Sequence, residues 1–445
     1  MYTHEQRKAD LRAIAKLGGP LLANNLAITG MTFADTVMAG RLGAVQLAGL
    51  AVGAAYWQLF VFIALGILMA VSPSIAHANG ANDRAAVVRY LRQAWWLATV
   101  VAGVLVCGLL QVSWVLPAIG IAPEILPTAI GYVHAITVGM PAAAAFFALR
   151  YASEGLRRTK PIMYIGLSAL VLNVFGNWVF MYGKLGMPRM GAVGCGVATA
   201  IAFWFMFLAM LVHMQRHRVY RAFDFFARID RPHLPTILEL ARIGAPIAGS
   251  IVAEGGLFVA AALMMGSMGA VTAGAHQVAV NYASFMFMVP LAVSSAMTIH
   301  VGHTLGAGDP ARARRVGLLG IGLCAGVMCV SALVIVLFND VIAALYTSDP
   351  PVRELAATLL LMAGLFQLSD GVQIGAAGAL RGHKDTAIPL LFCVFSYWIV
   401  GFPLAYYLGL VREGGPIYVW LGLIAGLSLS AVLLVSRFLA IAHKN

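Results

Sequence analysis

The sequence predicts an all-α membrane protein with twelve transmembrane helices, arranged as two six-helix bundles related by a pseudo-twofold axis along the membrane normal. Three observations lead to this fold class. The chain has 445 residues, of which 61% are hydrophobic and only 10% are charged, whereas about 25% of the residues of a soluble protein are charged. Its apolar runs are long enough to cross a bilayer as helices of about 20 residues. Finally, the second half of the chain repeats the first half.

The predicted helices are the twelve long apolar runs of the chain. These runs cover approximately 14–37, 45–73, 93–115, 126–149, 161–182, 192–214, 237–265, 271–301, 316–338, 354–379, 386–409 and 417–441. Polar and apolar residues do not alternate within them, as they would in the strands of a membrane β-barrel. We therefore exclude a barrel and expect each run to form one spanning helix.

The distribution of Lys and Arg predicts how these helices are oriented. If both termini face the cytoplasm, 24 of the 29 Lys and Arg residues fall on the cytoplasmic side. The five on the outer side are Arg41, Lys184, Arg189, Arg353 and Arg412. Such a bias is typical of cytoplasmic loops. It also explains the net charge of +12 without a nucleic-acid partner, and it makes the basic stretch 213–234 a cytoplasmic linker beside anionic lipid.

A shift of 226 residues aligns the chain with itself. Residues 17–20 then lie over 243–246, and residues 80–83 lie over 306–309. Because this shift covers an even number of spans, both halves have the same orientation in the membrane. We predict an N-terminal bundle over 1–215, a cytoplasmic linker over 216–235 and a C-terminal bundle over 236–445.

Two proline residues coincide in this alignment, Pro20 and Pro246, and both lie inside predicted spans. A proline removes one helical hydrogen bond and permits a bend. The alternatives are a hinge in each bundle or simple packing against a neighbouring helix.

Three carboxylates lie well inside predicted spans: Asp35, Glu254 and Asp370. A charge near the centre of the bilayer costs at least ~2.5–3.5 kcal/mol, and no Lys or Arg lies at a comparable depth in the sequence. Unpaired acids of this kind suit reversible capture of a proton or a metal cation; the alternative is a neutral, hydrogen-bonded carboxyl group. They also break the repeat: Glu254 aligns with Ile28 at the shift of 226, and Asp370 aligns with Phe146 at the shift of 224 that applies later in the chain.

Other polar and aromatic residues extend these candidates. Asn173 and Asn177 are four residues apart, on one helix face, and offer neutral oxygen ligands beside Asp35 for a hard cation. The alternative is hydrogen bonding between helices. Phe258 lies one turn after Glu254, where its ring suits a flat, lipophilic, cationic ligand, or where it simply packs in the core.

The sequence lacks the common motifs of ATP-driven and catalytic proteins. It contains no GxxxxGK[ST] phosphate loop, no HExxH and no GxSxG. We therefore expect a protein that is not an enzyme and has no cofactor apart from a coupling ion. An ion gradient is the expected energy source for any uphill transport, and the residues leave Na⁺ and H⁺ open.

Several motifs resemble signatures of the multidrug and toxic compound extrusion (MATE) family. They are residues 33–40, residues 244–246 followed by Glu254, residues 379–382, residues 183–188 leading to 191–194, and residues 364–367 leading to Asp370. The resemblance covers nearly the whole chain and is closest to the NorM branch.

This resemblance implies a multi-pass antiporter of the bacterial inner membrane, with both termini in the cytoplasm. It would export cationic or amphipathic compounds in exchange for Na⁺ or H⁺ by alternating access. Its partners would be small lipophilic cations and membrane lipids, with no nucleic acid, and a monomer would suffice. The alternative is a related flippase or exporter of lipid-linked oligosaccharide, which would need a cationic cavity for pyrophosphate.

The resemblance also assigns residues. The cation or proton coupling residues that it implies are Glu254, Asp370, Asp35, Asn173, Asn177 and Thr199. A sodium ion would bind at Glu254 and Asp370, or at Asp35, Asn173 and Asn177. The substrate-binding residues that it implies are Asp35, Phe258, Gln277 and Asp349. One departure concerns Phe366, since some NorM relatives have Tyr at that position, one turn before the tenth-span acid.

Overall fold

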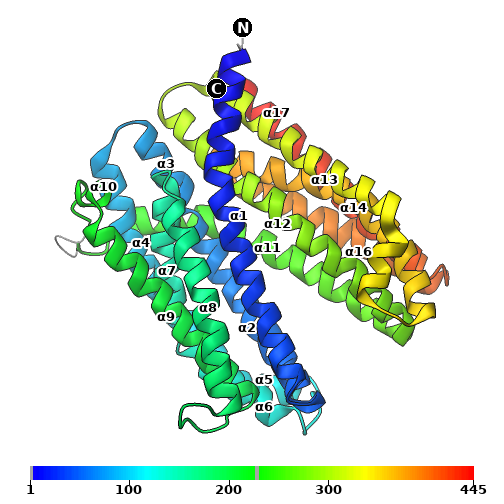
Figure 1. The fold of residues 1–445 in the computed structure, drawn as a ribbon. Coiled ribbons are helices and arrows are strands. Elements are labelled where there is room, and N and C mark those ends of the chain that lie inside the picture. Colours follow the sequence, from blue (N-terminus) through cyan, green and yellow to red (C-terminus); the bar gives the residue numbers. More distant parts are fainter. Residues whose placement is uncertain (1–3, 226–229, 445) are drawn as a thin grey trace. The chain divides into compact units, whose positions relative to one another are not determined.

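The computed structural model describes residues 4–225 and 230–444, and all regular secondary structure in this part of the chain is helical (Figure 1). The first half contains α1 (His4–Gly40), α2 (Ala44–Met69), α3 (Val71–Gly80), α4 (Arg84–Leu110), α5 (Val112–Ala118), α6 (Leu126–Thr137), α7 (Met140–Gly155), α8 (Lys160–Tyr182), α9 (Ala192–Arg216) and α10 (Arg218–Arg221). The second half contains α11 (Leu234–Ser267), α12 (Ala270–Gly306), α13 (Pro310–Tyr346), α14 (Pro350–Gly382), α15 (Ala387–Val394), η1 (Phe395–Gly401), α16 (Phe402–Tyr406), η2 (Tyr407–Val411) and α17 (Pro416–Lys444).

The predicted all-α membrane fold is confirmed, because every predicted run coincides with a helix or a series of consecutive helices. Within the described residues, ten helical segments are long and apolar enough to cross a membrane, and the pair α6 and α7, bent by 49°, makes an eleventh. The first predicted run lies on α1, a helix of 37 residues.

The chain forms two compact units, which we describe separately. One unit contains residues 19–248, and the other contains residues 1–18 together with 249–445. The boundaries between these units fall inside α1 and α11, close to Pro20 and Pro246. The bundles predicted over 1–215 and 236–445 follow the order of the chain instead, and they stay a prediction.

The internal repeat is visible in the turns that start matching helices. Asp83 accepts a hydrogen bond from the backbone N–H of Ala86 and so caps α4 (2.9 Å). Asp309, 226 residues later, caps α13 in the same way through the N–H of Arg312 (2.9 Å). Gly43 and Gly269, which also match in the repeat, precede α2 and α12 with φ of 115° and 112°. Only glycine adopts such a φ without strain.

The predicted linker is attached to α4 within the unit of residues 19–248. Asp230 receives a salt bridge from the Arg92 guanidinium (3.0 Å), and its backbone carbonyl accepts a bond from the Trp96 indole (2.9 Å). The Gln93 side chain donates to the carbonyl of Arg231 (3.1 Å) and accepts from the N–H of His233 (2.7 Å). The linker, apart from residues 226–229, which lie outside the described chain, therefore has defined contacts.

Tyr220 ties the other end of the linker to the same unit. Its hydroxyl shares a hydrogen bond of 2.6 Å with Ser153, and burial raises the pKa of the Tyr220 phenol. The phenol therefore stays neutral at physiological pH.

In the other unit, α14 packs against α12, α13 and α17. The eleventh predicted span is not a uniform helix, because the π-helices η1 and η2 interrupt it. Gly401 at the end of η1 lies against Gly426 of α17, where a Cβ on Gly426 would come within 2.9 Å of the Gly401 Cα. Two glycines therefore let the π-helical segment lie directly on its neighbour, and the site below depends on this segment.

Candidate ion-coupling sites

Within the unit of residues 19–248, three predicted residues lie around the carboxylate of a fourth, Asp35. Asp35 of α1 accepts a hydrogen bond from the side-chain amide of Asn177 on α8 (2.5 Å). That amide also donates to the Asn173 oxygen one turn earlier (3.3 Å), and the Asn173 amide donates to the Thr199 hydroxyl on α9 (3.1 Å). Both asparagines are fully buried. The structure thus brings together Asp35, Asn173, Asn177 and Thr199, which we call the Asp35 site.

The Asp35 site also contains a residue that sequence reasoning missed. The buried thiol of Cys195 on α9 hydrogen-bonds the Asp35 carboxylate. Thr199, four residues later on the same helix face, completes this edge of the site. The amide oxygen of Asn177 is buried without a hydrogen-bond partner among the described residues. A free acceptor beside a carboxylate is suited to a cation.

A second site lies in the unit of residues 1–18 and 249–445. Glu254 of α11 and Asp370 of α14 are close enough for the Glu254 charge to act on Asp370. Asp370 is 6% exposed, and its Oδ1 has no hydrogen-bond partner in the described chain. In a medium of low dielectric constant two like charges repel strongly. One proton or one metal ion relieves this repulsion.

The structure corrects one expectation about charge at this second site. No cation was expected near the buried acids, yet the Arg381 guanidinium at the end of α14 acts electrostatically on Glu254. Arg381 also donates to the Ser294 hydroxyl (2.8 Å). Arg381 lies eleven positions after Asp370, which placed it at the membrane edge in the sequence. Its guanidinium nevertheless reaches Ser294, whose hydroxyl bonds the carbonyl of Ile374, about two turns earlier on α14.

Two further polar residues join the second site and were missed from the sequence. Tyr397 of η1 is fully buried, and both Glu254 and Asp370 act on it electrostatically. Gln373, one turn after Asp370, donates from its amide to the Tyr397 hydroxyl (2.9 Å). We call Glu254, Asp370, Gln373 and Tyr397 the Asp370 site. A signal was present in the sequence, since Tyr397 and Gln373 are polar groups inside apolar runs.

Of the predicted substrate residues, Phe258 belongs to a row of aromatic rings. It contacts Phe366 edge-on, with ring centroids 5.7 Å apart, and Phe366 in turn contacts Trp420 at 5.8 Å. Phe366 is the residue that stands where some relatives have Tyr. Its ring contacts both the Phe258 and the Trp420 rings, so this position adds apolar surface to the aromatic row.

The remaining predicted substrate residues lie elsewhere. Gln277 is exposed on α12, and Asp349 is exposed at the start of α14, where its N–H donates to the Thr347 hydroxyl (3.2 Å). Neither residue is part of the aromatic row. Asp35 belongs to the other unit.

The two sites differ from transition-metal centres. Within residues 4–225 and 230–444, no group of three or more His, Cys, Asp or Glu side chains is arranged to hold a metal ion. The available acceptors are instead one or two carboxylates with amide and hydroxyl oxygens, which are ligands for hard cations. The sites are therefore candidates for a proton or an alkali cation.

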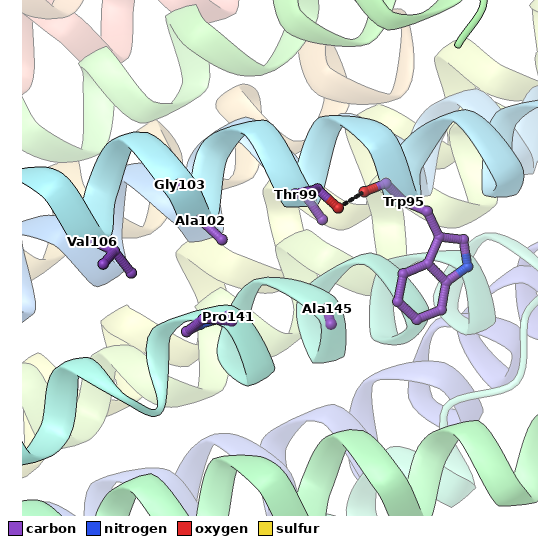
Figure 2. Close-up of a pocket in the computed structure, with 8 residues that line it drawn as sticks. Trp95, Thr99, Ala102, Gly103, Val106, Pro141 and Ala145 are labelled. Atoms are coloured by element: carbon purple, nitrogen blue, oxygen red, sulfur yellow. Dashed lines mark hydrogen bonds between the residues drawn. The ribbon is translucent and has the colours of Figure 1, made fainter. Parts of the chain in front are cut away.

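A cavity of about 340 Å³ lies apart from the Asp35 site, between α4 and α7 (Figure 2). Its lining is mostly apolar and contains none of the predicted site residues: Trp95, Ala98, Thr99, Ala102, Gly103, Val106, Pro141 and Ala145. The Thr99 hydroxyl, its one polar side chain besides the Trp95 indole, is satisfied by the Trp95 carbonyl (2.9 Å). The lining of this cavity therefore contains no carboxylate and none of the candidate coupling residues.

Comparison with known proteins shows similarity over nearly the whole chain. The sequence model of the MatE family matches residues 20–179 and 246–407. The multidrug resistance protein PmpM of Pseudomonas aeruginosa is 38% identical, with 98% of this chain and 93% of that protein covered. The multidrug resistance protein NorM of Aliivibrio fischeri is 39% identical, with 98% and 95% covered.

Solved structures agree on the fold. A eukaryotic MATE transporter superposes with a TM-score of 0.89 at 19% identity, covering 98% of both chains. A MATE transporter in its bent conformation also gives a TM-score of 0.89, at 17% identity, covering 98% of this chain and 96% of that one. At this level of identity the structures establish the fold alone, and the sequence relatives establish the family. The chain therefore belongs to the MATE family of transporters, in its NorM-like branch, and is not an enzyme.

Proposed function

We propose that this protein is a secondary active antiporter that exports cationic or amphipathic compounds in exchange for Na⁺ or H⁺. It works by alternating access in the bacterial inner membrane, with both termini in the cytoplasm. Small lipophilic cations are its substrates, and a monomer is sufficient for transport. The relatives PmpM and NorM, whose names describe multidrug resistance, support this substrate class.

The observation that carries the proposal is a carboxylate within the spanning segments of each unit, with an unsatisfied oxygen at the same site. These oxygens are Oδ1 of Asp370 and the side-chain oxygen of Asn177, which lies beside Asp35. Leaving a buried acceptor without a partner costs about 1–3 kcal/mol. A bound cation removes this cost at either site.

Exchange follows if ion and substrate compete for the same negative charge. In the outward-open state an ion enters and binds at Glu254 and Asp370, which lowers the negative charge there, and the site then holds a cationic drug less tightly. The drug leaves outward, and the ion-loaded carrier returns and releases the ion inside. An ion shifts the equilibrium between the two states only by as much as it prefers one of them.

Export from proteoliposomes tests the proposal, with ethidium as substrate and with a Na⁺ gradient and a pH gradient imposed separately. We expect at least one gradient to drive export in the wild type. Glu254→Gln should lose this coupled export while still inserting. Glu354→Gln, which makes the same chemical change at an exposed position of α14, should keep it. Normal ion-driven export by Glu254→Gln would contradict the proposal.

The flippase alternative requires cations around a pyrophosphate group. The candidate sites here are acidic, and the one guanidinium described near them, Arg381, faces Glu254 and donates to Ser294. Because these contacts engage the guanidinium, it is not available to bind a pyrophosphate group. If correctly inserted protein fails to export ethidium with either gradient, the flippase becomes the favoured function.

A further inference from the structure

We propose that Gln373, held by Tyr397, is the second acceptor for the coupling cation at the Asp370 site. The ligand is a single monovalent cation, either Na⁺ or a proton. This inference rests on the proposed antiport function but assigns residues that neither the family resemblance nor the comparisons name.

Two buried acceptors at this site lack hydrogen bonds. Oδ1 of Asp370 and the amide oxygen Oε1 of Gln373 are both buried without a partner in the described part of the chain. Asp370 is 6% exposed and Gln373 only 3% exposed. They are three residues apart on α14, so both side chains leave the same face of the helix. Two acceptors on one face cannot satisfy each other, because neither carries a hydrogen to donate.

A single cation is able to satisfy both acceptors at once. A proton on the Asp370 carboxyl turns it into a donor that the Gln373 oxygen is able to accept. A sodium ion coordinates both oxygens directly, since carboxylate and amide oxygens are ligands for hard cations. Either cation removes both unsatisfied acceptors. A neutral apolar ligand would leave both of them unsatisfied.

The side chain of Gln373 is oriented by its contact with Tyr397. Its amide nitrogen donates to the Tyr397 hydroxyl (2.9 Å), which leaves the amide oxygen as the free end. The Tyr397 ring is fully buried, and its hydroxyl is also hydrogen-bonded by Ser430 of α17. With the amide nitrogen bonded to this hydroxyl, the amide oxygen is directed away from Tyr397, which acts as a positioning residue.

The backbone that carries Tyr397 is irregular and also contacts the segment of Glu254. It lies in the π-helix η1, and π-helical turns are rare and frequently mark functional sites. The next residue, Trp398, donates from its indole to the carbonyl of Ala253 (3.0 Å), directly before Glu254. The same π-helical segment is therefore bonded both to the Gln373 amide and to the backbone beside the second acid.

Thermal unfolding in detergent tests this assignment without requiring transport. A cation that binds only the folded state raises its melting temperature as the ion concentration increases. The melting temperature is measured against Na⁺ at fixed pH and constant ionic strength, with choline replacing Na⁺, and then against pH without Na⁺. The variants are Tyr397→Phe and Gln373→Met. Tyr418→Phe, at a 46% exposed tyrosine of α17, is the matched control.

The wild type and Tyr418→Phe should show the same midpoint for the effective ion. In Tyr397→Phe and Gln373→Met that midpoint should move about tenfold in Na⁺ concentration, or about one pH unit for a proton, as expected for the loss of one charged hydrogen bond or ligand. A shift in the Na⁺ titration identifies sodium, and a shift confined to the pH titration identifies a proton.

A purely structural role gives a different result. The melting temperature of the variants would fall, but the midpoints would stay where Tyr418→Phe has them, and this would overturn the assignment. A wild type whose melting temperature responds to neither ion would overturn it as well. Failure of the antiport proposal is read separately, from ethidium export, because the melting experiment contains neither substrate nor gradient.

Discussion

At the scale of single residues, the Asp35 site depends on the direction of its hydrogen bonds. The amide nitrogen of Asn177 donates to both Asp35 and Asn173, while its own oxygen is left free. Asn177 therefore stabilises the charged form of Asp35 and at the same time presents an acceptor to an incoming ion. An apolar side chain of similar size would remove both functions.

We predict that Asn177→Leu lowers ion-driven ethidium export by about tenfold or more, since a hydrogen bond to a charged group contributes about 1.5–3 kcal/mol. Initial rates in proteoliposomes, normalised to inserted protein, measure this. Asn281→Leu, at an exposed asparagine of α12, is the control and should export normally. Equal rates in the two variants would remove the Asp35 site from the coupling mechanism.

Part of each site was predictable from residue spacing and part was not. Asn173 and Asn177 were recognised because four residues make one helical turn and place both on one face. Cys195, Arg381 and Tyr397 were not recognised, because their roles depend on which helices lie side by side. From the sequence alone, a cysteine inside an apolar run is interpreted as a packing residue. Only the structure shows that a carboxylate lies next to it.

At the scale of secondary-structure elements, the repeat has conserved helix starts while its site residues have diverged. Asp83 and Asp309 occupy matching positions and cap α4 and α13 at the same distance, 2.9 Å. The carboxylates at the sites have no such counterparts. The helix starts therefore follow the repeat, and the site acids do not.

We expect Asp83→Ala and Asp309→Ala to destabilise the protein by similar amounts, about 1 kcal/mol each, because each loses one N-terminal capping bond. Melting temperatures in detergent measure this. Asp340→Ala, at an exposed position near the end of α13, is the control. A large loss for one cap and none for the other would show that the two turns are not equivalent.

The contact between α4 and the linker gives a second prediction at this scale. Arg92→Gln removes the salt bridge to Asp230 and the guanidinium bonds to the carbonyls of Asp224 and Phe225. We expect trypsin to cut within 216–235 several times faster in this variant, because proteolysis follows local opening. Arg89→Gln, at an exposed arginine of the same helix, should leave the cutting rate unchanged. No difference between the two would mean that α4 does not restrain the linker.

The sequence located helices well and their interruptions poorly. Hydropathy follows the apolar length of a segment, so all twelve runs were found. It carries no information on the 49° bend between α6 and α7 or on the π-helices of the eleventh span. Those features depend on close contacts, such as that of Gly401 with Gly426, between residues far apart in the chain.

At the scale of the whole molecule, the two chain ends have a common location that bears on topology. The start of α1 and the end of α17 belong to one unit and lie at the same end of it (Figure 1). Asp10 of α1 is fully buried there and bonds His300 (2.9 Å) and Arg312 (2.7 Å). Both termini on one side of the membrane is also what an even number of spans requires.

We predict that this common side is the cytoplasm. Leu185→Cys, at a 73% exposed residue of the predicted outer loop, should react with a membrane-impermeant maleimide in intact cells. Glu5→Cys, exposed near the start of α1, should react only after the membrane is permeabilised. The wild type, which retains its five native cysteines, gives the background. The opposite labelling pattern would reverse the topology.

The repeat was visible in the sequence because glycine and aspartate positions match at turns and Pro20 matches Pro246 inside helices, even where the rest of the helices differ. The boundaries of the compact units were not visible. They fall inside α1 and α11 rather than at the linker, because a contact between helices is not constrained by the order of the chain. Predicting them requires knowing where each half of a long helix packs.

The most direct test of ion-coupled exchange reverses the usual experiment. Proteoliposomes are given an ethidium gradient alone, and the opposing movement of Na⁺ or H⁺ is recorded. Because coupling is reciprocal, we predict that the drug gradient drives one of these cations in the opposite direction in the wild type and in Glu354→Gln, but not in Glu254→Gln. Ethidium movement in the wild type without any movement of either cation would contradict antiport.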